Sequence, residues 1–169
     1  GGIPFDAVIA SMPRIVGVRG RMELVGKFQS GARIFVDYAH TPDALRNALQ
    51  ALRLHISGKL HLVFGCGGDR DRGKRMLMGR VAATLSHRTI VTDDNPRSED
   101  AATIRADILK DCRNAVEISD RADAITFGIS QLADGDALLI AGKGHETSQT
   151  LGDRTVDFDD ATVVRAAIG

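Results

Sequence analysis

The sequence contains no tryptophan, and aromatic residues make up only 4% of its 169 residues. So few aromatic side chains disfavour a platform on which the bases of single-stranded nucleic acid would stack. The charges are balanced as well, because 22 Lys and Arg residues face 22 Asp and Glu residues, for a net charge of +0. A chain without net charge has no general attraction for nucleic acid or for an anionic membrane. We therefore expect neither as a partner.

Long hydrophobic runs are also missing, since none approaches the roughly 18 residues that a transmembrane helix needs. The first residues, GGIPFDAVIASMPR, lack the basic start of a signal peptide. The only cysteines, Cys66 and Cys112, lack the spacing of a metal or redox site, which fits a reducing compartment. These absences predict a cytoplasmic protein. Cys66 is expected to be a small buried residue and not a nucleophile, because no His or Asn partner is identifiable near it.

Three common motifs of catalytic sites are absent. The sequence has no G-x-x-x-x-G-K-[ST] motif, because its Gly-Lys pairs are followed by Phe, Leu, Arg and Gly. No G-x-G-x-x-G follows the first predicted strand, and no two histidines have H-x-x-x-H spacing. A self-sufficient P-loop enzyme, an ordinary dinucleotide dehydrogenase and a metalloprotease with both histidines on one helix are therefore disfavoured.

Short aliphatic runs alternate along the chain with longer amphipathic stretches. The runs lie at residues 33–36, 60–64, 89–91, 115–118 and 137–140, and their spacing approaches the ~30 residues of a βαβ unit. Helical patterns lie between them, and a last strand at 154–158 and a last helix at 159–168 follow. We predict an α/β fold, a Rossmann-like, open, mostly parallel sheet of about six strands with helices on both faces.

Local signals mark the starts of several predicted helices. Thr41 followed by Pro42 is typical of a helix start, with a capping Thr and Pro at the first helical position. Asp100 and Asp120 are plausible caps of two later helices. The first thirty residues do not follow the alternation, although residues 21–28 are expected to form a strand. The length suits one domain plus an appendage.

Polar and glycine-rich segments follow the predicted strands, at residues 37–42, 65–75, 93–97, 119–121 and 142–146. In an open α/β sheet, ligands bind outside the carboxyl ends of the strands, so we expect these segments at one edge. Arg70 and Arg97 offer planar forks for a carboxylate or phosphate, whereas Asp94 and Glu146 would hold an ammonium. The residues therefore predict a ligand that carries both a carboxylate and an amine.

Each of these features, taken alone, has a plainer explanation. Residues 65–68 could form a tight strand-to-helix turn without a ligand, and residues 93–97 an Asx turn before a proline. His40 alone is more often a capping or core residue than a catalytic base. Only the combination of segments indicates a function.

In their order along the chain, five segments closely resemble the C-terminal domain of the Mur ligases. They are RGRME (19–23), DYAHTP (37–42), GCGGDRDRGKR (65–75), DDNPR (93–97) and GKGHE (142–146). The resemblance covers about residues 19–168. It implies that residues 1–18 end the family's central, ATP-binding domain, that residues 19–30 form a linker, and that residues 31–169 form the amino-acid-binding C-terminal domain.

The resemblance implies an ATP-dependent acid–amino-acid ligase of peptidoglycan biosynthesis, in the branch that uses diaminopimelate. ATP would phosphorylate the terminal carboxylate of UDP-N-acetylmuramoyl-L-alanyl-D-glutamate, and the amine of meso-diaminopimelate would attack the acyl phosphate. Mg²⁺ would be held mainly by the central domain, which also carries the P-loop. This chain alone should therefore not form the acyl phosphate, and the enzyme's own N-terminal and central domains would be its partners.

The resemblance also implies two sets of binding residues. The ATP set is Arg21, Asp37, Tyr38 and His40. The meso-diaminopimelate set is Arg70, Asp94, Asn95, Arg97, Gly142 and Glu146. In the second set, Arg97 would pair with the distal carboxylate, and Asp94 and Glu146 with the distal ammonium. No catalytic residue and no metal ligand is assigned within this chain.

Two alternatives stay open. A lysine-adding or folyl-polyglutamate relative would share the family, and tighter binding of L-lysine than of meso-diaminopimelate in calorimetry would favour it. A detached small-molecule-binding module would bind its ligand without catalysis, and no partner domain would be encoded upstream. An upstream reading frame with a G-x-x-G-K-[ST] motif would support the ligase.

Overall fold

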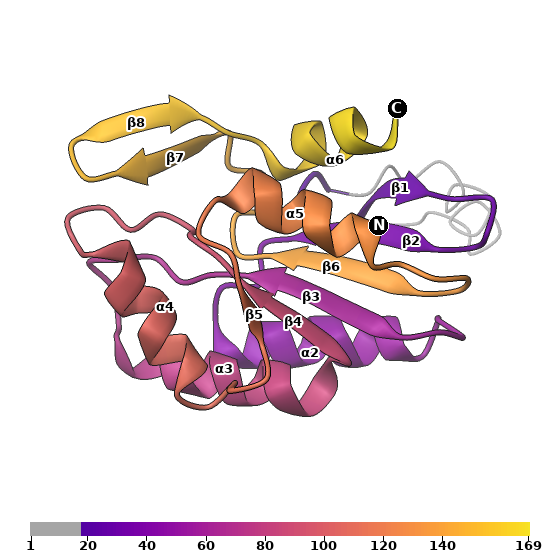
Figure 1. Ribbon diagram of the computed structural model, residues 1–169, viewed down its shortest axis with the longest axis horizontal. Coiled ribbons are helices and arrows are strands. Elements are labelled where there is room, and N and C mark those ends of the chain that lie inside the picture. The colour runs from indigo at the N-terminus through magenta and orange to yellow at the C-terminus, as the bar shows by residue number, and fades with distance from the viewer. Residues whose placement is uncertain (1–17) are drawn as a thin grey trace, which may run out of the picture.

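A six-stranded open sheet forms the centre of the structure, a computed structural model in which residues 18–169 are described (Figure 1). The strands are β1 (Glu23–Lys27), β2 (Arg33–Asp37), β3 (Leu60–Phe64), β4 (Arg88–Val91), β5 (Val116–Glu117) and β6 (Ala137–Ala141). They lie in the order β1-β2-β6-β3-β4-β5. β1 runs antiparallel to β2, and every other neighbouring pair in this sheet is parallel.

Helices cover both faces of the sheet (Figure 1). One face carries α2 (Pro42–Arg53), α3 (Gly73–Leu85) and α4 (Ala101–Leu109), and the other carries α5 (Arg121–Ser130) and α6 (Asp160–Ile168). Successive strand residues point to opposite faces, so Leu62 of β3 joins the first hydrophobic cluster and Val63 joins the second. Every residue of β3 and β6 is buried, because both strands are central and covered on both sides.

The predicted helix caps are confirmed. Thr41 caps α2, with Pro42 at the first helical position, and Asp100 and Asp120 cap α4 and α5. Each of the three side chains accepts a hydrogen bond from the backbone N–H three residues later. These bonds satisfy donors that have no partner inside the helix.

The predicted fold class is confirmed, but one strand lies elsewhere. The segment predicted as the last strand, residues 154–158, does not join the main sheet, because β8 (Arg154–Asp157) pairs antiparallel with β7 (Ser148–Leu151). The two residues between these strands include Gly152, whose φ of +63° suits a tight hairpin turn. The sixth place in the main sheet belongs to β1, from the segment predicted as a strand before the domain.

The predicted domain boundaries stay predictions. The tail predicted for residues 1–18 lies outside the described residues, apart from Val18. The linker predicted for residues 19–30 contains β1, which is paired with β2. Glu23 of β1 also forms an ion pair with Arg165 of α6, with 3.3 Å between the oxygen and the nitrogen. This segment therefore packs against the domain that follows it.

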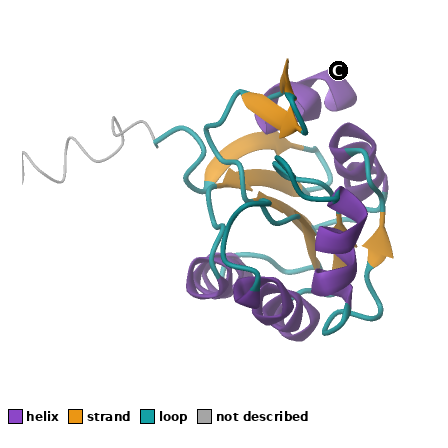
Figure 2. Ribbon diagram, turned by 90° about the vertical axis from the view of Figure 1, so that its left-hand side faces the viewer, coloured by secondary structure: helices purple, strands orange, loops and turns teal. Residues whose placement is uncertain are grey.

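The carboxyl ends of β2, β3, β4 and β6 lie at the same edge of the sheet, on the left in Figure 1. Figure 2 looks onto that side and shows the loops that follow the strands. The parallel arrangement therefore brings together segments that are far apart in the sequence, as ligand sites of open α/β sheets require.

Candidate functional site

A cavity of about 430 Å³ opens where the carboxyl ends of the strands meet. Its lining residues are Tyr38, His40, Thr41, Gly67, Arg70, Asp71, Lys74, Asp94, Asn95, Arg97, Gly142 and Glu146. The structure thus brings together the whole set predicted for meso-diaminopimelate, and it adds two residues predicted for ATP. The other two predicted ATP residues, Arg21 and Asp37, do not line this cavity.

Asp94 supplies a buried carboxylate at the cavity. It follows β4, it is only 8% exposed, and burial raises the pKa of its carboxyl above the ordinary value, against the opposing positive charges of Arg121 and Lys143. Among the described residues, no side chain or backbone N–H donates a hydrogen bond to this carboxylate. The Asp94 oxygens are not among the fully enclosed polar atoms without a partner, so they open to the cavity. Because burial disfavours the charged form of this carboxyl, a cation that faces it is stabilising. Asp94 is therefore suited to receive a positive group from a ligand.

Gly142 lies directly against Asp94 because it has no side chain. A Cβ atom at this position would lie 2.5 Å from Oδ2 of Asp94, and the φ of Gly142 is +115°. Its N–H donates to the backbone oxygen of Asp37 at 3.1 Å, which ties the end of β6 to the end of β2. Glycine is needed here both for the backbone conformation and for the close approach.

Glu146 supplies a second carboxylate at the cavity, and the Asn95 side chain binds it. Nδ2 of Asn95 donates to Oε2 of Glu146 at 2.9 Å. Oδ1 of Asn95 accepts from the N–H of Thr150 at 2.9 Å and from Nζ of Lys143 at 3.3 Å. The asparagine side chain therefore links the loop after β4 to the loop after β6 and to β7.

Arg97 lies in a backbone conformation that the hairpin stabilises. Its φ is +52°, in the left-handed region that a residue with a side chain seldom adopts. The N–H of Arg97 donates to Thr150 of β7 at 3.1 Å, and its carbonyl accepts from the N–H of Gly152 at 2.8 Å. Nη1 of the guanidinium donates to the backbone oxygen of Gly68 at 2.8 Å. The separate hairpin therefore orients one of the two predicted arginine forks.

Arg70 is exposed on the loop after β3, and two contacts hold that loop to the loop of Arg97. Asp69 accepts from the hydroxyl of Ser98 at 2.7 Å and from its N–H at 3.2 Å, and these bonds lower the pKa of the Asp69 carboxyl. The N–H of Asp69 donates to Glu99 at 2.6 Å, and Glu99 pairs with the buried Arg75 at 2.8 Å. The separation of the two arginine forks thus depends on this cross-link.

The residues predicted for ATP lie beside the cavity and contact one another. The Cζ atom of Arg21 lies 4.6 Å from the centre of the Tyr38 ring, and the rings of Tyr38 and His40 lie 4.4 Å apart. Asp37 is buried, and its two carboxylate oxygens accept from the N–H groups of Met22 and Ala39 at 2.7 Å and 2.8 Å. Asp37 therefore joins the segment before β1, which carries Arg21, to the loop after β2, which carries Tyr38.

Two lysines at this edge were not predicted from the sequence. Lys74, at the start of α3, lines the cavity, and its Nζ donates to the backbone oxygen of His40 at 2.9 Å. Lys143 is buried behind the cavity and binds two of its lining residues. Both lysines stand inside the glycine-rich segments that indicated the site, so their position in those segments was the available signal.

Cys66 follows β3 and is 3% exposed, which agrees with the expectation of a small buried residue. Burial raises the pKa of its thiol to about 12. A thiol with such a pKa carries almost no thiolate at neutral pH, so it is unsuited to act as a nucleophile.

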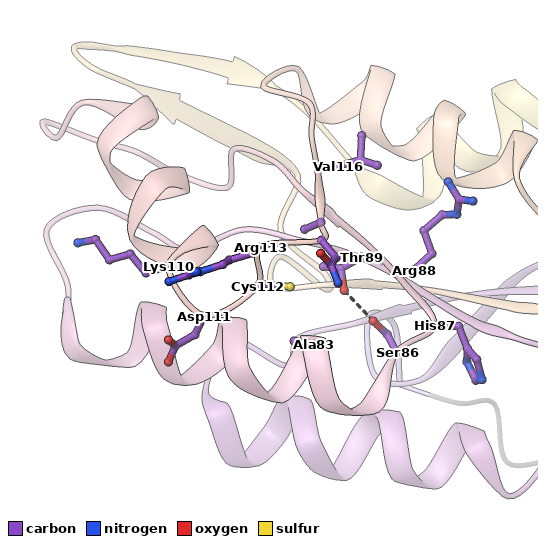
Figure 3. A pocket seen from close by; sticks show the side chains of 12 residues that line it. Ala83, Ser86, His87, Arg88, Thr89, Lys110, Asp111, Cys112, Arg113 and Val116 are labelled. Carbon is purple, nitrogen blue, oxygen red and sulfur yellow. Dashed lines mark hydrogen bonds between the residues drawn. The ribbon is translucent and has the colours of Figure 1, made fainter.

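A larger cavity, of about 700 Å³, lies between the C-terminal ends of α3 and α4 and the first residues of β4 (Figure 3). Its charged side chains do not converge, since Lys110 and Arg88 extend in opposite directions (Figure 3). Lys110 is paired with Asp107, and Asp111 with Arg80. This cavity contains none of the segments that indicated a function, so the smaller cavity is the candidate site.

Within residues 18–169, no three His, Cys, Asp or Glu side chains lie close enough to hold a metal ion. No helix among the described residues is both long and apolar enough to cross a bilayer.

Known proteins are similar to this chain in sequence and in fold. The family described as "Mur ligase, glutamate ligase domain" matches residues 20–144, which is more than half of the chain. The chain belongs to the Mur ligase family. The matched span includes every predicted site residue except Glu146, which stands two positions beyond it. The predicted membership of the Mur ligases is thus confirmed.

Three similar Mur ligases indicate the branch of the family. A UDP-N-acetylmuramoyl-L-alanyl-D-glutamate–2,6-diaminopimelate ligase of Agrobacterium fabrum is 52% identical over 167 residues, which cover 99% of this chain and 34% of that protein. A ligase of the same name from Bradyrhizobium diazoefficiens is 55% identical over 161 residues, covering 95% of this chain and 33% of that protein. A solved structure of a ligase with that name is 43% identical, with a TM-score of 0.83, and the match covers 98% of this chain and 34% of that one.

The chain spans about a third of the length of these Mur ligases. The similarity establishes the family and the fold of the matched part. It tests no individual binding residue, so the roles of the two predicted residue sets stay predictions.

Proposed function

We propose that this chain is the amino-acid-binding domain of an ATP-dependent ligase that adds meso-diaminopimelate to UDP-N-acetylmuramoyl-L-alanyl-D-glutamate in peptidoglycan biosynthesis. The similar Mur ligases carry the name of this activity. In this proposal residues 1–18 end a central domain, residues 19–30 form a linker and residues 31–169 form the C-terminal domain. Both the ATP and the nucleotide-linked peptide are then supplied in the cytoplasm.

One observation carries the proposed ligand class. The carboxylate of Asp94 is buried at the cavity without a hydrogen-bond donor among residues 18–169, while the Arg97 guanidinium lines the same cavity. An amino acid supplies both of the missing partners, an ammonium for Asp94 and a carboxylate for the arginine fork. A phosphate or a simple dicarboxylate would leave Asp94 facing another negative charge.

meso-Diaminopimelate has a second amine, and this explains why it fits the cavity better than an amino acid with one amine. Asp94 and Glu146 would hold the distal ammonium and Arg97 the distal carboxylate, so that end of the molecule is bound on both charges. The other amine is then free to lose its proton and react. Arg70, on the exposed side of the cavity, remains for the carboxylate next to that amine.

The proposed reaction joins this amine to an activated carboxylate. ATP transfers its terminal phosphoryl group to the D-glutamate carboxylate of the nucleotide-linked peptide and leaves as ADP. The amine attacks the acyl carbon, phosphate departs with the bonding electrons, and the nitrogen loses a proton to give the amide. This domain contributes by holding the amine at one position and orientation, which turns a bimolecular step into an effectively intramolecular one.

ATP would contact the group formed by Arg21, Asp37, Tyr38 and His40. The Arg21 guanidinium over the Tyr38 ring and the neighbouring imidazole of His40, tilted by 56° to that ring, gather a cation and two π systems suited to contact a nucleotide base. Lys74, which binds the backbone of His40, adds a positive charge between this surface and the amino-acid residues. The central domain would hold Mg²⁺ with the phosphates.

The test uses the full-length protein encoded by the gene, with release of ADP measured against each amino acid in the presence of the nucleotide-linked peptide. The wild-type protein should use meso-diaminopimelate in preference to L-lysine and L-glutamate. Arg97→Lys should raise the KM for meso-diaminopimelate by about 10- to 100-fold, because a lysine cannot reproduce the bidentate fork. Arg80→Lys, the same exchange at an exposed position on α3 outside the cavity, is the matched control.

Preferential use of L-lysine or L-glutamate by the wild-type protein would exclude the proposed substrate. An unchanged KM in Arg97→Lys would exclude the proposed role of the fork. An open reading frame without an upstream ATP-binding segment would favour the detached binding module instead.

A further inference from the structure

Lys143 is a fully buried lysine directly behind the candidate site. It belongs to the loop after β6, and its side chain has 0% exposure. It does not line the cavity, whereas Asn95 and Glu146, which it contacts, both do. Lysine is almost never completely buried unless its ammonium is paired, so this position needs a physical reason.

Three acceptors surround the ammonium of Lys143. Its Nζ lies 2.5 Å from the backbone oxygen of Ser148, 3.3 Å from Oδ1 of Asn95 and 3.4 Å from Oε2 of Glu146. An ammonium has three N–H donors, so the set of partners matches its capacity. A buried ion pair adds little stability compared with well-packed apolar residues, so stability alone does not account for a lysine here.

The contacts of Lys143 determine which atoms of Asn95 and Glu146 face the cavity. Because Oδ1 of Asn95 accepts from Lys143 and from the N–H of Thr150, its amide can only point Nδ2 toward Glu146. Oε2 of Glu146 then receives both Nδ2 of Asn95 and the ammonium of Lys143. Among the described residues, no donor reaches Oε1, which is left for a ligand.

The same ammonium also reaches the second half of the site. Ser148 is the first residue of β7, and the next residues of the hairpin bind both backbone groups of Arg97. The buried ammonium of Lys143 therefore links Glu146, proposed to hold the ligand's ammonium, with β7. That strand orients Arg97, which is proposed to hold the ligand's carboxylate.

We propose that Lys143 is a positioning residue for amino-acid binding. It acts through Asn95 and Glu146, it directs Oε1 of Glu146 into the cavity, and it does not touch the amino acid itself. This inference rests on the proposed function of the site. It adds that the ammonium and the carboxylate at the distal end of the amino acid are recognised by side chains, Glu146 and Arg97, whose positions both depend on the buried ammonium of Lys143.

The test compares Lys143→Met with Lys59→Met in the full-length protein. Lys59, at the opposite end of β3, is exposed and carries the same side chain outside the site. Lys143→Met should raise the KM for meso-diaminopimelate by about 10- to 100-fold, because loss of the ammonium frees both partners from their orientation. The KM for ATP should change by less than about 2-fold, since Nζ of Lys143 bonds to Asn95, Glu146 and Ser148 and to no residue of the ATP group. Lys59→Met should leave both values unchanged.

A double-variant cycle separates positioning from general damage. If Lys143 acts through Glu146, the effect of Lys143→Met should shrink to less than about 3-fold in a Glu146→Gln background. Additive effects of the two changes, or an equal rise of the KM for ATP, would overturn the proposal.

A structure of the wild-type protein with meso-diaminopimelate bound gives a second readout that does not depend on how well any variant folds. Oε1 of Glu146 should contact the amino acid while Nζ of Lys143 remains on Oε2. Direct contact of Nζ with the amino acid would make Lys143 a binding residue and overturn the proposal. If the wild-type protein prefers another amino acid, the proposed function fails, and the same measurements with that amino acid still decide the role of Lys143.

Discussion

Replacing Arg121 by methionine should destabilise this domain strongly, because the change leaves the buried Asp160 without its partner. Both side chains have 0% exposure. Nε of Arg121 lies 2.7 Å from Oδ1 of Asp160, and Nη2 lies 2.8 Å from Oδ2. Nη2 also donates to the backbone oxygen of Ala141 at 3.1 Å, so Arg121 joins α5 and α6 to the end of β6 beside the site.

The magnitude follows from the burial of both partners. Removing one member of a buried ion pair costs about 3–5 kcal/mol, because the remaining charge is neither solvated nor paired. For a domain of this size, each 1 kcal/mol lowers Tm by roughly 2–4 °C, so we expect Tm to fall by roughly 6–20 °C. The pair of Arg165 with Glu23 is a matched control, since Arg165 is 58% exposed and the two atoms lie 3.3 Å apart. Arg165→Met should cost less than about 1 kcal/mol.

Urea unfolding of the 169-residue chain, followed by far-ultraviolet circular dichroism, suits this measurement because the chain has no tryptophan. The double variant Arg121→Met with Asp160→Asn should be more stable than Arg121→Met alone, because it also removes the unpaired carboxylate. A loss below about 1 kcal/mol in Arg121→Met, or a double variant less stable than the single one, would refute this account of the pair.

Two further predictions concern the candidate site, and a third concerns the two cysteines. Gly142→Ala should raise the KM for the amino acid and lower Tm more than Gly152→Ala does. The new Cβ at position 142 would lie 2.5 Å from Asp94, whereas a Cβ at position 152 meets nothing within 4 Å. Equal effects of the two variants in thermal melts and kinetics would contradict this. Because burial raises the pKa of Asp94 and only its ionised form attracts an ammonium, the KM should increase as pH falls through that pKa, starting at a higher pH than an ordinary aspartate would cause. Asp94→Asn should abolish this step in the pH profile. Cys66, with a pKa of about 12, and the buried Cys112 should resist iodoacetamide at pH 8 in the folded chain and react in guanidinium, as mass spectrometry would record.

The layered fold could be predicted because its signals are local. The aliphatic runs that became β2, β3, β4 and β6, and the caps Thr41, Asp100 and Asp120, are each defined within a few neighbouring residues. Hydrophobic period and capping act at that range, so the sequence reports them directly. The place of the last strand was missed because no strand was predicted at residues 148–151, although Gly152 and Asp153 between the two strands are a local hairpin signal.

The residues at the edge of the sheet could be predicted for a different reason. A parallel sheet places the carboxyl ends of its strands on one side, so Arg70, Asp94 and Gly142 had to lie near one another once the strands were known. Arg21 precedes β1 and Asp37 ends β2, and neither residue lines the cavity. The sequence pattern does not distinguish a residue that lines a cavity from one that holds the lining residues in place, as Asp37 does through Met22.

By itself, the sequence determined the alternation of the strands of the main sheet with helices, the family, and the polar segments that share one edge of the sheet. Only the tertiary structure decided which atoms face the ligand. Lys143 binds Asn95 from 48 positions away, and Arg121 binds Asp160 from 39 positions away. The left-handed backbone of Arg97 depends on a hairpin more than fifty residues later in the chain. The energies of such contacts depend on distance and burial in three dimensions, and neither quantity is a function of spacing along the chain.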